Sequence, residues 1–248
     1  MAFKLYNAPQ STCSQRVRFV LNAKGLTFEE LKLNLLEGDQ LKPEYLKLNP
    51  NGVVPTLDHD GEIIIDSNVI TEYLDEIAPP INFTPQDPVE RARMRALMHF
   101  IDEMPAAAVR VPTFNLAFLP SFQKMESEAF AAMVASKPLR REFMFTMGQA
   151  GFPRHEMDAA LARLRRTYER MDAEIEKTGG PWLLGECITL ADVAVMPSLV
   201  RIHDLGLADW QDLPRVVTWF DKIRAHPAYK PTFYHGSLLS ERFPHLRA

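Results

Sequence analysis

The sequence predicts an α+β protein that carries a small mixed sheet in its first third and helices alone after it. Apolar residues recur at every second position in short stretches before residue 66, whereas after residue 88 they recur at helical spacing. Prolines cluster between residues 79 and 88 and interrupt both kinds of element. We therefore expect a first domain over residues 1–80, a linker over 81–88 and an all-helical domain over 89–248.

The first domain has the order βαβ followed by ββα. Alternation over residues 3–6 and 31–35 predicts two strands, and helical spacing over 17–24 predicts a helix between them that Gly25 ends. The remaining elements are strands over 56–59 and 62–65, joined by a turn at Asp60 and Gly61, and a helix capped by Asp66 or Ser67.

The second domain shows apolar stripes at steps of three and four, which predict helices that face a core. One stripe runs from Met94 to Ile101 and a longer one from Met157 to Ile175. Thr189 and Asp192 have the spacing of a capping box, in which a hydroxyl and a carboxylate satisfy free amides at a helix start. A last clear helix is predicted between Pro214, which suits a first helical turn, and Pro227, which ends it.

Composition and charge exclude several classes of protein. The chain has 248 residues with 28 Lys and Arg against 32 Asp and Glu, a net charge of -4, which argues against a nucleic-acid binder. No apolar stretch approaches the roughly 18 residues that cross a membrane. Two cysteines, Cys13 and Cys187, form no disulfide framework, and the start of the chain lacks the pattern of a signal peptide. We therefore expect a cytoplasmic protein.

The segment over residues 11–18 lies between the first strand and the first helix and is rich in hydroxyls, with one thiol. Free amides and the positive end of the helix dipole stabilise an anion at such a position, and a thiolate is an anion of this kind. The alternative is that Ser11, Thr12 and Ser14 only cap the helix. The spacing leaves both interpretations open.

Two further segments are chemically suggestive. Pro55 directly precedes a strand, where a cis peptide bond would present the backbone N–H and C=O of Val54 to a peptide-like ligand. At Asp66 and Ser67 a carboxylate could pair with an amine while a hydroxyl and helix amides hold a carboxylate. The alternatives are an ordinary Asn-Gly turn at 51–52 and simple helix capping.

Taken together, the three segments describe glutathione lying across a thioredoxin-like sheet, and the sequence resembles the cytosolic glutathione S-transferases over nearly its whole length. The resemblance is carried by the 11–18 segment and by the Leu-Asn-Pro-x-Gly-x-Val-Pro stretch that ends at Pro55. It continues with Asp66 and Ser67, then Leu184 and Gly185, then the 189–192 box. It implies an N-terminal thioredoxin-like glutathione-binding domain, an all-helical bundle domain that shapes the second pocket, and a dimer.

The resemblance also implies roles for individual residues. The hydroxyl of Ser11 would donate a hydrogen bond to the glutathione sulfur, and Ser14 is the second choice for this role. The reactive cysteine of related classes corresponds to Ser11, so Cys13 is expected to pack in the first helical turn. The residues that would contact glutathione are Ser11, Thr12, Gln40, Val53, Val54, Pro55, Asp66 and Ser67. Many relatives carry glutamine where this chain has Val53, so one side-chain contact is expected to be missing.

The segment over residues 105–151 bears on the reaction, because it is long, apolar and rich in phenylalanine. The 11–18 motif is similar to that of the zeta class, which isomerises maleylacetoacetate, whereas the helical half resembles the bacterial β-etherases. These use glutathione thiolate to displace an aryloxy group from β-aryl ethers of lignin-derived aromatics, without a metal. The pocket residues predicted on this basis are Met94, Met98, Ile101, Phe114, Phe118, Phe143, Phe145 and His203.

Several alternatives stay open at this stage. A zeta-like isomerase, a disulfide reductase that depends on Cys13, and a non-catalytic glutathione-binding protein all fit the same first domain. The expected partners are a small aromatic electrophile and a second subunit, which would form a homodimer or a heterodimer with a paralogue. We expect no nucleic acid, membrane or metal among them.

Overall fold

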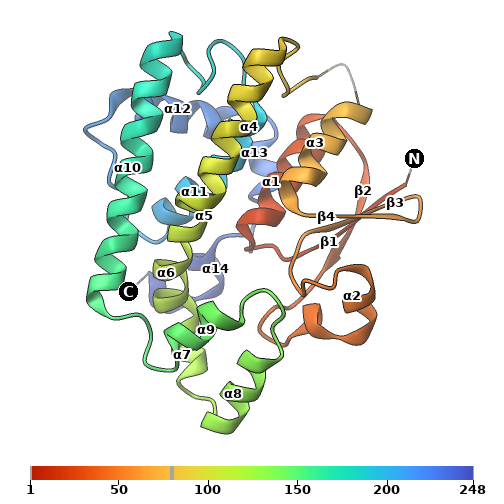
Figure 1. Ribbon diagram of the computed structural model, residues 1–248, viewed down its shortest axis with the longest axis vertical. Coiled ribbons are helices and arrows are strands. Elements are labelled where there is room, and N and C mark those ends of the chain that lie inside the picture. The colour runs from red at the N-terminus through yellow and green to blue at the C-terminus, as the bar shows by residue number, and fades with distance from the viewer. Residues whose placement is uncertain (1, 79–80, 248) are drawn as a thin grey trace.

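The computed structural model describes residues 2–78 and 81–247 and joins a four-stranded sheet to a helical domain (Figure 1). Pro79 and Pro80, which the sequence places at the start of the interruption, lie outside the described residues. Every strand of the described chain precedes residue 66, and the segments after residue 81 form helices and turns. The α+β fold class is therefore confirmed.

The sheet has the order β2-β1-β3-β4, with β1 parallel to β2 and antiparallel to β3. Leu5 of β1 lies opposite Leu57 of β3, and both side chains are fully buried. Helices α1 and α3 pack together between the sheet and the helical domain (Figure 1). The elements are β1 (Phe3–Asn7), α1 (Thr12–Ala23), β2 (Phe28–Lys32), η1 (Asp39–Leu41), α2 (Pro43–Leu48), β3 (Thr56–His59), β4 (Glu62–Ile65) and α3 (Ser67–Ile77).

The predicted hairpin and the cap at Asp66 are confirmed, but the second strand was placed wrongly. It runs over Phe28–Lys32 and not over 31–35. The Leu33 N–H still bonds the Asn7 carbonyl at 2.8 Å, but β1 ends at Asn7, so the pairing ends there. Leu33 and Leu35 instead pack with Tyr45 and Val54 in a separate apolar cluster. The alternation in sequence therefore reflects this second cluster.

The helical domain begins at α4, whose first residue, Pro88, is the last residue of the predicted linker. Thr189 and Asp192 form the predicted capping box at the start of α11, and Pro214 occupies the first turn of α12. The helices are α4 (Pro88–Glu103), α5 (Pro105–Ala108), α6 (Arg110–Thr113), η2 (Phe114–Phe118), α7 (Leu119–Phe122), α8 (Ser127–Ala135), α9 (Arg141–Met147), α10 (Arg154–Thr178), α11 (Leu190–Asp204), α12 (Pro214–Ala225), α13 (Tyr229–Thr232), α14 (Leu239–Arg242) and η3 (Pro244–Leu246).

One apolar core runs through both domains, because α1 packs against α11 as well as α3. Asp192 at the start of α11 is fully buried. Its carboxylate accepts hydrogen bonds from the Trp219 indole at 2.8 Å and from the Leu183 amide at 3.0 Å. The predicted capping box therefore also ties α11 to α12 and to the loop before α11. The sheet domain and the helical domain form one packed body.

Residues 114–152, here called the aromatic insertion, have a second apolar cluster of their own. Prolines at 105, 112 and 120 remove backbone donors, and the chain passes through short helices with a π-helical turn at η2. The helices α7, α8 and α9 extend beyond the rest of the helical domain at the lower end of the view (Figure 1). The buried residues of this cluster are Phe122, Phe130, Val134, Met144, Met147 and Phe152.

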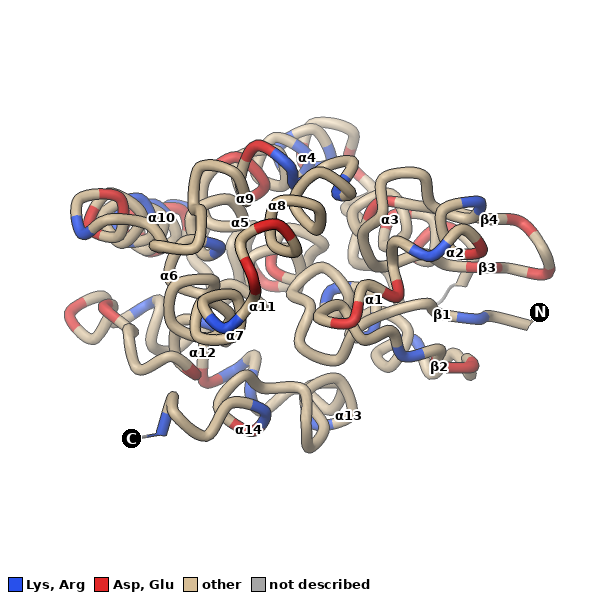
Figure 2. Tube along the Cα trace, turned by 90° about the horizontal axis from the view of Figure 1, so that it is seen from below, with Lys and Arg blue, Asp and Glu red and all other residues tan. Residues whose placement is uncertain are grey.

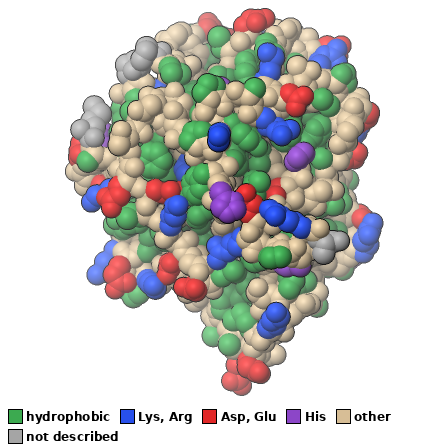
Figure 3. All heavy atoms as spheres, turned by 180° about the vertical axis from the view of Figure 1, so that it is seen from behind, with side chains coloured by type: hydrophobic (Ala, Val, Ile, Leu, Met, Phe, Trp, Pro, Cys, Tyr) green, Lys and Arg blue, Asp and Glu red, His purple; other side chains and the backbone are tan. Residues whose placement is uncertain are grey.

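Acidic and basic residues are interleaved along α4 and α10 (Figure 2). The face in Figure 3 likewise shows basic, acidic and apolar side chains next to one another. No helix within the described residues is both long and apolar enough to span a bilayer.

Candidate functional site

The loop from β1 to α1 places Ser11 at the start of a helix. Ser11 is the N-cap of α1, is half-buried, and its Oγ accepts a hydrogen bond from the Ser14 N–H at 3.3 Å. The next amides, of Thr12 and Cys13, begin the helix, where the helix itself offers no acceptor. Ser14 is fully buried, and its Oγ accepts from the Ala8 N–H at 3.4 Å. Of the two serines, Ser11 is thus the one whose side chain is partly open.

Contacts from distant parts of the chain fix this loop in place. The Arg18 guanidinium donates to the Pro9 carbonyl at 2.8 Å and to the Thr232 carbonyl at 3.0 Å. Arg201 of α11 donates to the Gln10 carbonyl, which directly precedes Ser11, and to the Thr113 hydroxyl at 3.2 Å. Burial lowers the pKa of Arg201 to about 10, which still leaves it charged near neutral pH. The helical domain therefore positions the Ser11 loop.

The Val54–Pro55 peptide bond is cis, as the sequence predicts. The Val53 carbonyl accepts hydrogen bonds from the Tyr45 hydroxyl at 2.6 Å and the Asn49 amide at 3.0 Å. Within the described residues, the N–H and C=O of Val54 have no hydrogen-bond partner. A backbone donor and acceptor on one residue are thus open to an extended ligand.

Asp66 and Ser67 form the start of α3. Asp66 is exposed and has a φ of 73°, a conformation that is costly for a residue other than glycine. Its Oδ1 accepts from the amides of Asn68 and Val69 at 2.9 and 3.2 Å, so the predicted capping is present. Ser67 is buried and its Oγ accepts from Arg16 at 3.4 Å. Asp66 keeps its second carboxylate oxygen free of any bond within the described chain.

Gln40 lies in η1 and is 6% exposed. Its amide nitrogen donates to the Leu35 carbonyl at 3.4 Å, while its Oε1 is buried with no partner among the described residues. A buried acceptor without a donor costs free energy, so this oxygen is suited to a ligand N–H. Val53 beside the cis bond is half-buried.

The predicted pocket residues separate into two groups. Phe114, Phe118 and Phe143 come together in the aromatic insertion, where the Phe114 ring centroid lies 5.1 Å from Phe118 and 4.9 Å from Phe143. Phe118 also packs on Phe243 at 5.5 Å, and the neighbouring Arg242 donates to the Gln10 side chain at 3.1 Å. The aromatic group is therefore linked to the Ser11 loop through Phe243 and Arg242.

The other predicted pocket residues lie elsewhere. Met94, Met98 and Ile101 are 0%, 3% and 2% exposed and belong to the main core, because the helical spacing that singles them out also marks the core face of α4. Phe145 is 79% exposed on α9. His203 is also exposed.

Two observations indicate that His203 lies away from the Ser11 loop. Its ring is exposed and stacks on Phe220 of α12 at 5.3 Å. Arg201, two positions earlier on the same helix, faces the Gln10 loop. Because residues two apart on a helix do not share a face, His203 points away from that loop.

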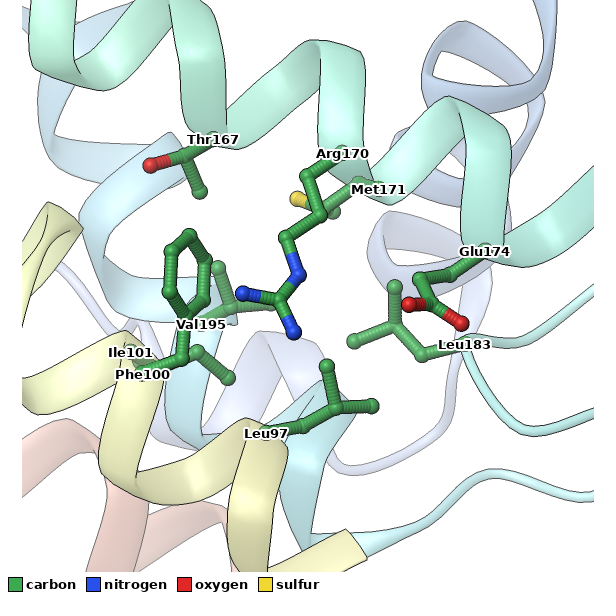
Figure 4. Close-up of a pocket in the computed structure, with 9 residues that line it drawn as sticks. All are labelled: Leu97, Phe100, Ile101, Thr167, Arg170, Met171, Glu174, Leu183 and Val195. Carbon is green, nitrogen blue, oxygen red and sulfur yellow. The ribbon is translucent and has the colours of Figure 1, made fainter. Parts of the chain in front are cut away.

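A cavity of about 10 Å³ lies between α4 and α10 (Figure 4). The Arg170 guanidinium crosses it and sits 3.9 Å from the centroid of the Phe100 ring. This volume holds no more than a water molecule, so the cavity is no substrate site. Ile101 is the one predicted pocket residue on its wall. No group of three or more His, Cys, Asp or Glu side chains within the described residues is arranged to hold a metal ion.

Sequence reasoning missed the charged residues that surround the site. Arg16 is 3% exposed, and its guanidinium bonds Ser67, Asn68 and Asp102. Arg110 and Arg201 lie on α6 and α11 of the helical domain. A signal was present for Arg201, because it is the only Lys or Arg in a helix whose other residues are mostly apolar.

The likeness to known proteins agrees with this geometry. The family model for the glutathione S-transferase N-terminal domain matches residues 5–85, and that for the C-terminal domain matches residues 154–222. A maleylacetoacetate isomerase of Pseudomonas aeruginosa is 32% identical over 92% of this chain and 93% of its own. The chain belongs to the glutathione S-transferase family.

Two other proteins are similar along the whole chain. Protein LigF of Sphingobium sp. strain SYK-6 is 28% identical over 94% of this chain and 93% of its own. Comparison of this structure with the crystal structure of beta-etherase LigF gives a TM-score of 0.82 over 94% of this chain. FtsZ-localized protein A of Caulobacter vibrioides is 26% identical over 98% of this chain and 92% of its own. The fold is thus that of the glutathione S-transferases.

Proposed function

We propose that this protein is a glutathione transferase that cleaves β-aryl ethers of lignin-derived aromatics. The observation that carries the proposal is the aromatic group of Phe114, Phe118 and Phe143 beside the Ser11 loop. The likeness to LigF supports it. The LigF structure covers 94% of this chain, so at least part of the aromatic insertion has a counterpart in LigF. The family as a whole supplies the glutathione chemistry.

Glutathione would lie along the three segments of the sheet domain. Its peptide backbone would pair with Val54, its amine with Asp66 and its γ-glutamyl carboxylate with Ser67 and the start of α3. Gln40 would receive its glycine end. With these contacts the sulfur would lie at the partly open hydroxyl of Ser11.

The reaction is a displacement at the carbon that carries the aryloxy group. Ser11 donates a hydrogen bond to the thiolate and the start of α1 lowers its energy, so the thiolate forms at neutral pH. A carbon–sulfur bond forms as the carbon–oxygen bond breaks, and the departing phenolate takes up a proton. The chain holds the two reactants in line and excludes water. No metal is required, because a neighbouring ketone activates the carbon.

The test is an assay of phenol release. The protein and glutathione are incubated with each enantiomer of a model β-aryl ether ketone, and the phenol and the thioether are measured. We expect both products in equal amounts from at least one enantiomer. Turnover of a standard electrophile without phenol from either enantiomer would overturn the proposal.

A zeta-like isomerase is the second candidate function. The isomerase of Pseudomonas aeruginosa is as similar in sequence as LigF, and the half-buried Arg110 and Arg140 would suit a substrate with carboxylates. Conversion of maleylacetoacetate without consumption of glutathione would favour this function.

A disulfide reductase would require Cys13, and a Cys13→Ser variant tests that role. Glutathione binding with no turnover of any electrophile would instead favour a non-catalytic protein.

The assembly is proposed to be a homodimer in the cytoplasm. The family likeness supports a dimer, and Val69 of α3 and Val89 of α4, which are 54% and 58% exposed, are candidate residues of its subunit surface. A heterodimer with a paralogue would use the same surface. Sedimentation of the purified chain alone distinguishes the two assemblies.

A further inference from the structure

Three basic side chains near the proposed site form no ion pair within the described residues. Most half-buried and buried Lys and Arg residues of the described chain have a hydrogen bond or an ion pair, as Arg16, Arg18 and Arg201 do. Arg110, Lys137 and Arg140 are half-buried and have neither within the described residues. A partly desolvated cation without a partner costs free energy unless an anion binds it.

Arg110 faces the Ser11 loop. It lies three residues before Thr113 on α6, and residues three apart share one helix face. The Thr113 hydroxyl accepts a hydrogen bond from Arg201, which also bonds the Gln10 carbonyl. Cys13, two residues after Ser11, is among the groups whose charge would act on Arg110. Arg110 is thus next to the position proposed for the sulfur.

Arg140 adds a second positive charge close to Arg110, because each lies about one helical turn before Phe143 or Phe114, whose ring centroids are 4.9 Å apart. Burial lowers the pKa of Arg110, and the charges of Arg140 and Arg16 lower it further. The carboxylate nearest to this group is that of Asp102. Its two oxygens accept from Arg16 and from Asn68, at 2.9 and 2.6 Å. The carboxylate that acts on Arg110 is therefore already engaged, and neither Arg110 nor Arg140 forms an ion pair within the described residues.

The aromatic insertion brings these charges over the sheet domain. Its α8–α9 loop contacts the turn before the cis bond, since a Cβ added to Gly52 would lie 3.0 Å from Pro138. Lys137 and Arg140 flank this contact within the same loop. Burial alone lowers the pKa of Lys137, which again indicates a cation without a partner. The loop thus lies against the turn that precedes Val54.

We propose that Arg110 and Arg140 form a subsite for a carboxylate on the second substrate, with Lys137 at its edge. A guanidinium pair binds a carboxylate through parallel hydrogen bonds, and the aromatic group of Phe114 and Phe143 adjoins it. The substrate class is then an aromatic electrophile that carries an acidic group. The inference rests on the proposed glutathione chemistry at Ser11.

The experiment compares two model aryl ether ketones that differ only in a carboxylate on the aromatic ring. We expect kcat/KM to be about 10- to 100-fold higher for the acid, the range of one or two charge-assisted hydrogen bonds. Arg110→Gln is expected to remove most of this preference, and Arg110→Lys to keep part of it. Arg141→Gln, whose exposed side chain bonds the Ala135 carbonyl, is the matched control and should keep the preference.

The KM for glutathione shows whether these residues bind a carboxylate of the second substrate or a carboxylate of glutathione itself. If Arg110→Gln raises the glutathione KM and leaves the preference between the ethers intact, these residues bind glutathione itself and the inference is wrong. If neither ether is cleaved, the same comparison is made with a chloronitrobenzene and its benzoate analogue. The ether-cleaving function then fails, and loss of the preference in Arg110→Gln still supports the subsite. Equal turnover of acid and neutral compounds by the unmodified protein contradicts it.

Discussion

Arg16 of α1 donates a hydrogen bond to the Asp102 carboxylate of α4 at 2.9 Å, and so joins the sheet domain to the helical domain. The second oxygen of Asp102 accepts from the Asn68 amide at 2.6 Å. Ser67, at the proposed γ-glutamyl position, contacts the same guanidinium. The start of α3 is therefore held in place by a residue of the helical domain.

Replacement of Asp102 by alanine should weaken both the fold and glutathione binding. Arg16 would keep its bond to the Ala194 carbonyl at 2.9 Å but would lose its only carboxylate within the described residues. We expect the free energy of unfolding to fall by about 2 kcal/mol. This is less than the loss of a fully buried ion pair would cost, because Asp102 is partly exposed. Urea denaturation measures this change, and titration with glutathione measures the affinity.

Glu72→Ala is the matched control, because Glu72 of α3 pairs with Arg95 of α4 at 2.7 Å across the same two helices. The Arg95 side chain is exposed and the Glu72 side chain is half-buried, and ion pairs at the surface contribute about 0 to 1 kcal/mol. Equal losses of stability in the two variants would show that Asp102 has no special role. Unchanged glutathione affinity in Asp102→Ala would separate it from the binding site.

Much of the fold could be predicted because its signals are local. The hairpin depends on Asp60 and Gly61, and the capping box on Thr189 and Asp192, so each can be read from a few adjacent residues. The end of β2 depends on where its partner strand β1 ends. The alternation of apolar residues within one strand does not reveal where the partner strand ends. The short helices α5 to α9 likewise depend on packing around prolines, so the sequence predicted only an apolar segment there.

The candidate site was predictable in part for the same reason. Ser11, Val54 and Ser67 each stand at the boundary of an element, where local rules apply. The pair of Arg16 and Asp102 is separated by 86 positions, and no local pattern marks such a contact. Periodicity cannot distinguish a core methionine from one on a pocket wall, which is why Met94 was proposed for the pocket.

Ser11→Ala and Ser14→Ala are expected to fail in different ways. Removal of the Ser11 hydroxyl should lower kcat/KM about 100-fold, as for the loss of one donor to a reacting anion, and raise the pKa of bound glutathione. Loss of the Ser14 hydroxyl removes a buried contact with Ala8 and should chiefly lower stability. The ultraviolet absorbance of the thiolate as a function of pH reports the first effect. A raised thiol pKa in Ser14→Ala alone would transfer the role to Ser14.

Phe143→Ala and Phe145→Ala test which face of α9 is used. Phe143 packs between Phe114 and Phe152, at 4.9 and 5.0 Å between ring centroids. Its removal should lower the free energy of unfolding by about 2 kcal/mol, less than for a fully buried ring, and raise the KM for an aromatic substrate. Phe145 is 79% exposed, so its removal should change stability by less than about 0.5 kcal/mol. Equal effects of the two substitutions would contradict this assignment.

His226 should make stability depend on pH in mildly acidic solution. Burial lowers the pKa of His226 from its ordinary value of 6.5, and its Nδ1 accepts from the Ala228 N–H at 3.1 Å, as a neutral ring does. As pH falls below 6.5, the unfolded chain binds this proton before the folded chain does. The contribution to stability is therefore present above pH 6.5 and is lost as pH falls from there to the lowered pKa.

His226→Asn provides the comparison, because asparagine can accept from the same amide in a turn and does not titrate. Urea denaturation of both proteins at a series of pH values between about 5 and 8 isolates the contribution of His226, since the remaining histidines are common to both. The unfolding free energy of the original protein minus that of the variant should be constant above pH 6.5. Below pH 6.5 this difference should decrease, because only the original protein loses the contribution of His226. Parallel curves over the whole range would mean that folding does not change the proton affinity of His226.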